Sequence, residues 1–120
     1  MTNNRFPKQV RLLRPSDFER VFAARCSMVA PWIVMYGAGN ELDQPRLGLV
    51  VSRRIGGAVQ RNRWKRLLRE AFRLTQEELP AIDLVCVARS KTPPPLTELK
   101  QSFIQLATRI DGKIQKAARQ

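Results

Sequence analysis

The sequence predicts an α+β fold, a sandwich in which one small mixed sheet carries helices packed mainly on one face. Its 120 residues suit a single domain with one modest hydrophobic core. Stretches with helical spacing of apolar residues alternate with short stretches rich in β-branched and aromatic residues, in the order α-β-β-α-β-α. The chain contains no internal repeat, so we treat residues 1–120 as one domain.

The first helix follows a basic arm that spans residues 1–13. Pro15 suits a first helical position, and Ser16 with Glu19 matches a capping box. The apolar side chains of this helix fall at positions i, i+3 and i+4, which form one face: Phe18, Val21 and Phe22. We expect the helix to end by about Arg25.

Two strands are predicted next, over residues 31–37 and 46–52, because both stretches are rich in residues that favour strands. The intervening turn, 37–45, contains Gly, Asn and Asp, which tolerate turn conformations. We expect the two strands to form an antiparallel hairpin, with an extra short strand near Ser27.

The second half of the chain begins with a strong helix from about residue 58 to 79, which Pro80 ends. Residues 82–88 form a nearly all-apolar strand, and such a strand belongs in the centre of a sheet. The last helix should start near Leu96 or Thr97. Its inner face is predicted from helical spacing: Leu99, Phe103, Leu106 and Ile110.

The end of the chain is expected to differ from the rest of this last helix. Gly112 should weaken the helix, because glycine is a poor helix former. Residues 113–120 are then predicted to form a basic tail.

The charge of the chain points to a polyanionic partner. Lys and Arg number 22 against 10 Asp and Glu, for a formal net charge of +12. A nucleic acid and an anionic membrane surface both fit this charge. The chain has no histidine, which excludes Ser-His-Asp and Cys-His nucleophilic sites and most zinc sites.

The cellular setting is predicted to be the cytoplasm. Cys26 and Cys86 each lie in an apolar stretch, so buried free thiols are expected, with a disulfide as the alternative. The N-terminus lacks the apolar core of a signal peptide. The longest mostly apolar stretch, 28–39, is interrupted by Pro31 and is too short to span a bilayer.

Residues 60–73 carry the strongest functional signal. On a helical wheel the apolar residues occupy one side, and an adjoining side is nearly pure cation. The stretch has six cations and only Glu70 in opposition, whereas a solvated helix face usually mixes both signs. Guanidinium groups match phosphate oxygens in bidentate geometry, so this face is predicted to bind nucleic acid.

Residues 58–70 resemble the signature of the bacterial ribonuclease P protein subunit, with its core Arg-Asn-Arg-x-Lys-Arg-x-x-Arg. The resemblance extends to residues 17–22, 34–36, 48–54 and 87–89. Trp64, where an aliphatic residue is more usual, and Gly57 are departures that leave the local packing open.

This resemblance implies a left-handed β-α-β crossover and an accessory role in an enzyme whose RNA subunit removes the 5′ leader of precursor tRNA, with Mg²⁺ expected for that RNA-catalysed reaction. It implies a face for the catalytic RNA: Arg53, Arg61, Asn62, Arg63, Lys65, Arg66 and Arg69. It also implies a cleft for the single-stranded leader, at Phe18, Phe22 and Tyr36.

The residues themselves favour such a cleft, because aromatic rings stack on unpaired bases of any sequence. The same rings could instead be core, and Trp32 is expected on the strand face of Tyr36. Without histidine or spacing that brings carboxylates together, the protein is not expected to be catalytic by itself or to bind a metal. The sequence implies no protein partner. The alternative functions are a structural RNA-binding protein, such as a ribosomal component, and a basic protein that binds membranes or compacts DNA.

Overall fold

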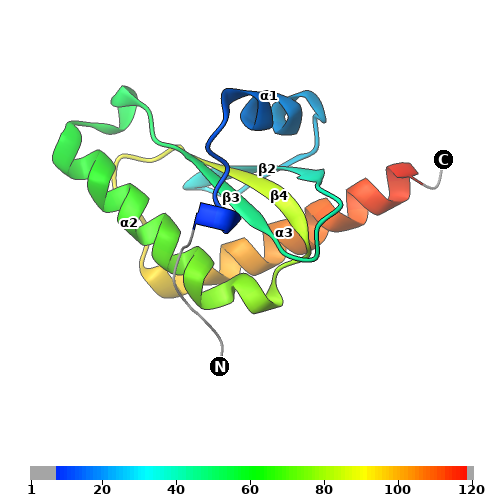
Figure 1. The fold of residues 1–120 in the computed structure, drawn as a ribbon. Helices are drawn as coiled ribbons and strands as arrows, with labels where there is room; N and C mark the ends of the chain where they lie inside the picture. Colours follow the sequence, from blue (N-terminus) through cyan, green and yellow to red (C-terminus); the bar gives the residue numbers. More distant parts are fainter. Residues whose placement is uncertain (1–7, 119–120) are drawn as a thin grey trace.

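The computed structural model describes residues 8–118 (Figure 1). The helices within these residues are α1 (Pro15–Ala23), α2 (Ala58–Thr75) and α3 (Leu96–Ala118). The strands are β1 (Ser27–Val29), β2 (Ile33–Gly39), β3 (Arg46–Val50) and β4 (Ile82–Ala88), and short 3-10 turns lie at η1 (Lys8–Val10), η2 (Arg53–Ile55) and η3 (Gln76–Glu78). The predicted element order and the extra strand near Ser27 are both confirmed.

The four strands form one mixed sheet in the order β1-β2-β4-β3. Strand β4 is central, as its apolar sequence predicts, and pairs antiparallel with β2 and parallel with β3. The predicted hairpin between β2 and β3 is therefore wrong, because β4 lies between them. A strand that is apolar on both faces is buried most fully at the centre of a sheet. Burial of β4 therefore outweighs direct pairing between β2 and β3.

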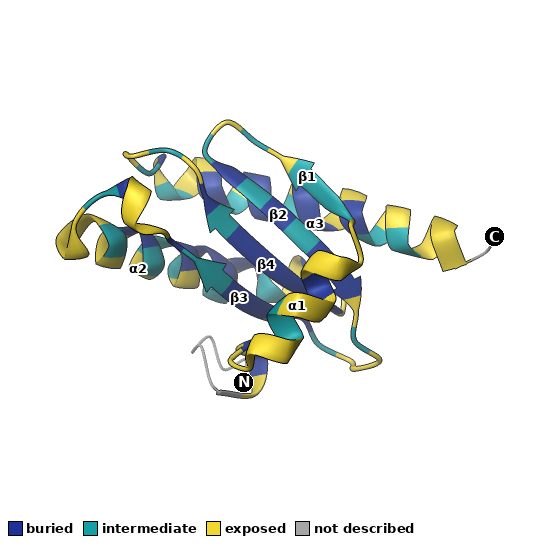
Figure 2. Cartoon of the chain, turned by 90° about the horizontal axis from the view of Figure 1, so that it is seen from above, coloured by how far each residue is buried: buried dark blue, intermediate teal, exposed yellow. Residues whose placement is uncertain are grey.

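Helix α2 connects the parallel strands β3 and β4 and packs under the sheet as seen in Figure 2. In that view the chain leaves β3, passes behind the sheet as α2 and returns to the sheet as β4, and this path is a left-handed crossover. This departs from the strong preference for right-handed connections, and it agrees with the hand that the family resemblance implies.

The helices cover the two faces of the sheet unequally. Helices α2 and α3 lie on one face and the short α1 lies on the other (Figure 1). The main core lies between the sheet and the two long helices, and the largest side chains buried in it are Trp64, Phe72, Phe103, Ile33 and Met35. A smaller cluster under α1 contains Leu12, Val21, Ala38 and Val85. The prediction of helices mainly on one face is confirmed.

Trp64 is fully buried, and its indole N–H donates to the carbonyl oxygen of Ser90 at 2.9 Å. A buried indole requires such an acceptor. The bond ties α2 to the loop that follows β4, which explains how an aromatic side chain is accommodated at this position.

Helix α1 begins at Pro15, which was one of the two start signals in the sequence. Pro15 occupies the first helical turn, after the extended residue Arg14. The predicted capping box is wrong, because Arg14 rather than Ser16 is the N-cap and no side chain caps the helix. Proline has no backbone N–H, so a helix that begins with proline has one unpaired amide fewer at its start. The start of α1 therefore depends less on a side-chain cap.

The two ends of the described chain are more ordered than the sequence suggests. Val10 and Leu12 are buried, and the amide of Leu12 donates to the carbonyl oxygen of Leu47 at 3.0 Å. Part of the predicted arm therefore lies along the outer edge of β3. Helix α3 continues through Gly112 to Ala118, so residues 113–118 belong to the helix and do not form a separate tail. Residues 1–7 of the arm and 119–120 of the tail lie outside the described residues.

Candidate nucleic-acid interface

The cationic face of α2 forms a shallow depression of 450 Å³. The side chains that line it are Asn62, Lys65, Arg66, Arg69, Glu70 and Arg73. Four of these are residues that the sequence predicted to bind RNA. Their i, i+3 and i+4 spacing brings them to one side of the helix while Trp64 and Leu68 on the other side are buried in the core. Burial of the apolar stripe therefore fixes which way the cations face.

The other three predicted residues do not line this depression. Arg53 lies exposed in η2, the turn before the helix, and Arg63 is exposed further round α2. Arg61 is half-buried, and its Nε is a buried donor without a hydrogen-bond partner. The predicted RNA-binding set is thus one compact group of four residues with three outlying arginines.

Glu70 and Arg73 form an ion pair one helical turn apart, with Arg73 Nε donating to Glu70 Oε2 at 3.0 Å. This hydrogen bond lowers the pKa of Glu70 and raises the pKa of Arg73. Within residues 8–118, no carboxylate lies within ion-pair distance of Lys65, Arg66 or Arg69. These three side chains are the cations that the depression offers to an anion, and Arg73 is internally neutralised.

A second group of predicted residues is aromatic and lies on the opposite face of the sheet. The rings of Phe22 and Tyr36 meet edge to face, with centroids 4.8 Å apart and planes at 77°. Phe22 is 37% exposed and Tyr36 is half-buried. Phe18 packs directly over Gly48 of β3, where a Cβ would lie 2.7 Å from two carbons of the ring. Phe18 thus depends on the missing side chain of Gly48.

The sheet beside α1 is only partly covered. Tyr36, Val50 and Val87 are half-buried and pack against the small cluster under α1, and the teal stretches of β2, β3 and β4 in Figure 2 mark this surface. One short helix is too narrow to cover four strands. The result is an apolar floor next to the exposed rings, which a flat nucleobase could contact.

Trp32 does not join this aromatic group. It packs against the main core on the α2 and α3 side of the sheet, so its expected place beside Tyr36 is wrong. Trp32 precedes β2, which begins at Ile33, so the alternation that orients Val34 and Tyr36 does not extend to it.

A groove of 200 Å³ at the outer edge of β3 brings the two groups together. Phe18 lines it from α1, and Lys65 and Arg69 line it from α2. The two predicted binding surfaces are therefore contiguous. Arg11 and Leu13 also line the groove. The predicted sites omit these two residues because residues 1–13 were predicted to form a basic arm. The alternation of the apolar residues Val10 and Leu12 was the sequence signal that could have indicated a segment packed on the sheet.

A buried carboxylate holds α1 in place over the sheet. Asp83 of β4 is fully buried and accepts hydrogen bonds from Arg46 Nε at 2.8 Å and Asn40 Nδ2 at 3.0 Å. Arg20 of α1 also pairs with Asp83, and it donates to the carbonyl oxygen of Gly39 at 2.9 Å. Asp83 also raises the pKa of Arg46 through their hydrogen bond. This network sets the position of the aromatic side chains that α1 carries.

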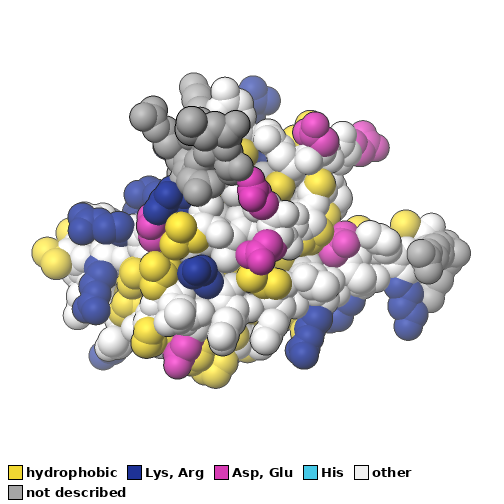
Figure 3. Space-filling model, turned by 90° about the horizontal axis from the view of Figure 1, so that it is seen from below, with side chains coloured by type: hydrophobic (Ala, Val, Ile, Leu, Met, Phe, Trp, Pro, Cys, Tyr) yellow, Lys and Arg dark blue, Asp and Glu magenta, His cyan; other side chains and the backbone are white. Residues whose placement is uncertain are grey.

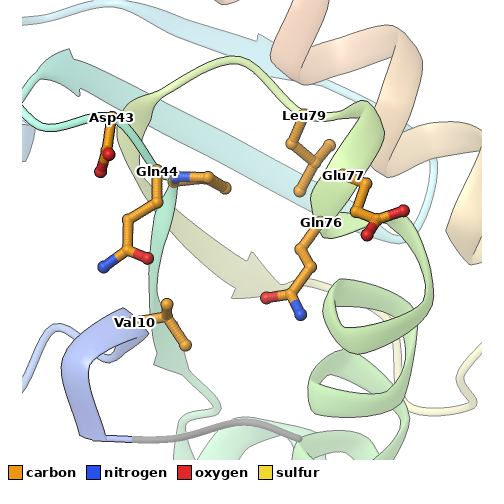
Figure 4. Close-up of a pocket in the computed structure, with 7 residues that line it drawn as sticks. Val10, Asp43, Gln44, Gln76, Glu77 and Leu79 are labelled. Atoms are coloured by element: carbon orange, nitrogen blue, oxygen red, sulfur yellow. The ribbon is translucent and has the colours of Figure 1, made fainter. Parts of the chain in front are cut away.

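The charges are unevenly distributed. Seen from below, Lys and Arg side chains gather at the end of the molecule where α2 begins, at the left of Figure 3. A pocket of 380 Å³ elsewhere has the opposite character, because Asp43 and Gln44 face Gln76 and Glu77 across it (Figure 4). Two carboxylates repel phosphate, so this pocket is unsuited to nucleic acid.

The two cysteines are free thiols, as expected. Cys86 is fully buried, and burial raises the pKa of its thiol far above the ordinary value. No helix among residues 8–118 is long and apolar enough to cross a membrane. In the same part of the chain, no group of three or more His, Cys, Asp or Glu side chains is arranged to hold a metal ion.

The family model described as Ribonuclease P matches residues 6–111. The chain is 48% identical over 85 residues to the ribonuclease P protein component of Escherichia coli O139:H28, which covers 70% of this chain and 71% of that protein. It resembles the solved RNase P protein of Thermotoga maritima with a TM-score of 0.74 and 30% identity, over 82% of this chain and 96% of that one. A mutant RNase P protein of Staphylococcus aureus, described as defective in mRNA degradation, gives a TM-score of 0.76 and 29% identity over 87% of this chain and 90% of that one.

Proposed function

The chain belongs to the ribonuclease P protein family, and from this membership we propose that it is the protein subunit of ribonuclease P. In this role it binds the catalytic RNA subunit and the 5′ leader of precursor tRNA. It thereby assists the endonucleolytic cut that produces the mature 5′ end. The observation that carries the proposal is the groove in which Phe18 meets Lys65 and Arg69, because it joins a cationic helix to an aromatic surface.

The α2 depression is the proposed contact with the catalytic RNA. No carboxylate among residues 8–118 pairs with Lys65, Arg66 or Arg69, and the three side chains are held on a rigid helix rather than a loop. Phosphates of a folded RNA lie in a fixed geometry, which a rigid array of cations can match. Arg53, Arg61 and Arg63 are proposed to extend this contact around the start of α2.

The leader is proposed to lie across the aromatic surface. The exposed ring of Phe22 and the half-buried ring of Tyr36 stand beside the apolar floor of the sheet. Stacking of this kind tolerates any base. A protein that serves many precursor tRNAs needs such tolerance, because their leaders differ in sequence.

Hydrolysis is assigned to the RNA subunit, with Mg²⁺ held by that RNA. The chain has no histidine and offers no obvious general base for the reaction. We place the complex in the cytoplasm, where precursor tRNA is made in bacteria.

The decisive experiment is reconstitution. The purified protein, freed of RNA, should leave precursor tRNA intact, and it should support cleavage in moderate salt once the catalytic RNA is added. Cleavage by the RNA-free protein would contradict the assignment of the chemistry. Failure to bind the catalytic RNA would contradict the proposed role itself.

The leader surface is tested with Tyr36→Ala and with Tyr36→Phe as its matched control, since the control keeps the ring. Loss of one stacking platform should weaken precursor tRNA binding by about 1–3 kcal/mol. Binding of mature tRNA should not change. The melting temperature is measured in parallel, because a purely structural Tyr36 would lower stability and weaken all binding together.

A further inference from the structure

A groove of 380 Å³ lies beyond the aromatic surface, where the chain leaves α1 and where the last turns of α3 extend past the sheet (Figure 1). Its walls are mostly small and apolar, with one cation at each side: Ala38, Cys26, Ile114, Ala117, Arg25 and Lys113. None of these residues belongs to the RNA-binding or leader-binding sets described above.

The backbone of Arg25 is unusual for its residue type. Arg25 follows the last turn of α1 with φ of 53°, in the left-handed region, and its amide donates to the carbonyl oxygen of Phe22 at 3.1 Å. Glycine is the usual residue at this position after a helix, because a side chain is strained there. A long cation at a site that favours glycine indicates that the side chain serves a purpose other than ending the helix.

Lys113 faces the groove from the other side. Its Nζ donates to the carbonyl oxygen of Ser27 at 3.3 Å, which holds the ammonium beside the start of β1. The side chain is exposed, and no carboxylate in the described part of the chain pairs with it. The ammonium therefore keeps its charge available for an anion.

The groove is continuous with the aromatic surface along the chain. Phe22 is followed by Ala24 and Arg25, and Tyr36 is followed on the same strand by Ala38 and Gly39. A strand of RNA lying across Phe22 and Tyr36 would reach these walls next.

We propose that this groove, between Arg25 and Lys113, binds the more distal nucleotides of the 5′ leader. The two cations contact backbone phosphates, and the apolar walls contact a sugar or base. Positive charge flanking an apolar groove suits single-stranded RNA, which presents both charge and apolar faces. The inference rests on the proposed function, since it extends the path of the leader.

The test uses the reconstituted holoenzyme and precursor tRNAs whose leaders are lengthened one nucleotide at a time. In the wild type, affinity should rise when the leader reaches the aromatic surface and again when it reaches the groove. Arg25→Gly and Lys113→Gln should each reduce the second rise by about three- to tenfold, the size of one phosphate contact. The first rise should be unchanged, and Arg25→Gly should melt at the wild-type temperature or higher. Arg109→Gln, on the same helix but outside the groove, is the matched control.

The native thiols provide a second measurement. Cys26 lies in the groove, and Cys86 is fully buried. A maleimide should modify Cys26 more slowly when a long-leader substrate is bound than when a short-leader substrate is bound.

The outcomes separate the two proposals. If both groove variants keep wild-type affinity at every leader length, the groove assignment is overturned while leader binding at the aromatic surface stands. If the wild type does not distinguish precursor from mature tRNA, the proposed leader site fails, and the groove assignment fails with it.

Discussion

Replacing Glu70 with Gln should strengthen binding to the catalytic RNA. Arg73 lies in the same depression as Lys65, Arg66 and Arg69, but the carboxylate of Glu70 neutralises it. The substitution keeps the shape of the side chain and removes its charge. Arg73 then becomes a fourth cation available to phosphate.

The magnitude follows from counting contacts. The three available cations of the depression contribute about −2 to −3 to the slope of log affinity against log salt, and Arg73 as a fourth makes the slope steeper by about 0.7 to 0.9. Affinity at low salt should rise about three- to tenfold, the value of one charge-assisted contact. Stability should fall by only about 0.2–0.5 kcal/mol, because the pair is half-exposed and lies on one helix.

Binding of the catalytic RNA is measured across a salt series for the wild type and for Glu70→Gln. Glu77→Gln removes an exposed carboxylate from the acidic pocket and controls for net charge alone. In the double variant with Arg73→Ala the gain should disappear. Because Arg73 lowers the pKa of Glu70, the carboxylate stays ionised near neutrality, and moving from about pH 8 to pH 6 should not reproduce the gain. An unchanged slope, or a gain that persists in the double variant, would refute the reasoning.

Three further substitutions or modifications test the support of the aromatic surface and the state of the thiols. Gly48→Ala places a Cβ 2.7 Å from the ring of Phe18, so the ring must move. We expect the free energy of unfolding, measured in urea, to fall by about 1–3 kcal/mol and leader binding to weaken. An unchanged midpoint of urea unfolding would contradict the contact. Asp83→Asn breaks the buried network under α1 and should lower the free energy of unfolding by about 2–3 kcal/mol. This is less than the loss of a wholly buried ion pair would cost, because the arginines that pair with Asp83 are partly exposed. If the variant loses less stability than a variant of an exposed carboxylate does, Asp83 does not anchor α1. Alkylation of the folded protein should modify the half-buried Cys26 and spare Cys86 until the protein unfolds, because burial keeps the latter a thiol.

Local patterns predicted the parts of the fold that depend on burial. The unbroken apolar run of β4 placed it at the centre of the sheet, and the spacing of Leu99, Phe103 and Ile110 identified the buried face of α3. The α2 face was predictable for the same reason. Its cations share one side because Trp64 and Leu68 are fully buried on the other.

The errors arose where tertiary partners decide the outcome. Nothing within residues 31–52 reveals that β4 will insert between β2 and β3, since either neighbour offers the same backbone hydrogen bonds. Gly112 lowers helix propensity locally, but Ile110 and Ile114 still pack against the core on either side of it, and this contact carries α3 onward. The signal of Ser16 was outweighed by Pro15, whose fixed backbone begins α1 two residues earlier than a Ser16 cap would.

The contiguity of the two surfaces bears on how the proposed function would work. Phe18 rests on Gly48 of β3, and the groove it lines at the outer edge of β3 is shared with Lys65 and Arg69 of α2. Helix α1 is tied to the sheet through Asp83, and α2 is tied through Trp64 to the loop that follows β4 and packs its apolar side in the core under the sheet. The distance between the aromatic and cationic groups is therefore set by the sheet between them, and neither group can shift alone. Under the proposed function, this rigid connection would position a leader held on the rings relative to the catalytic RNA, and the protein would then act as a spacer between substrate and catalyst as well as a source of affinity.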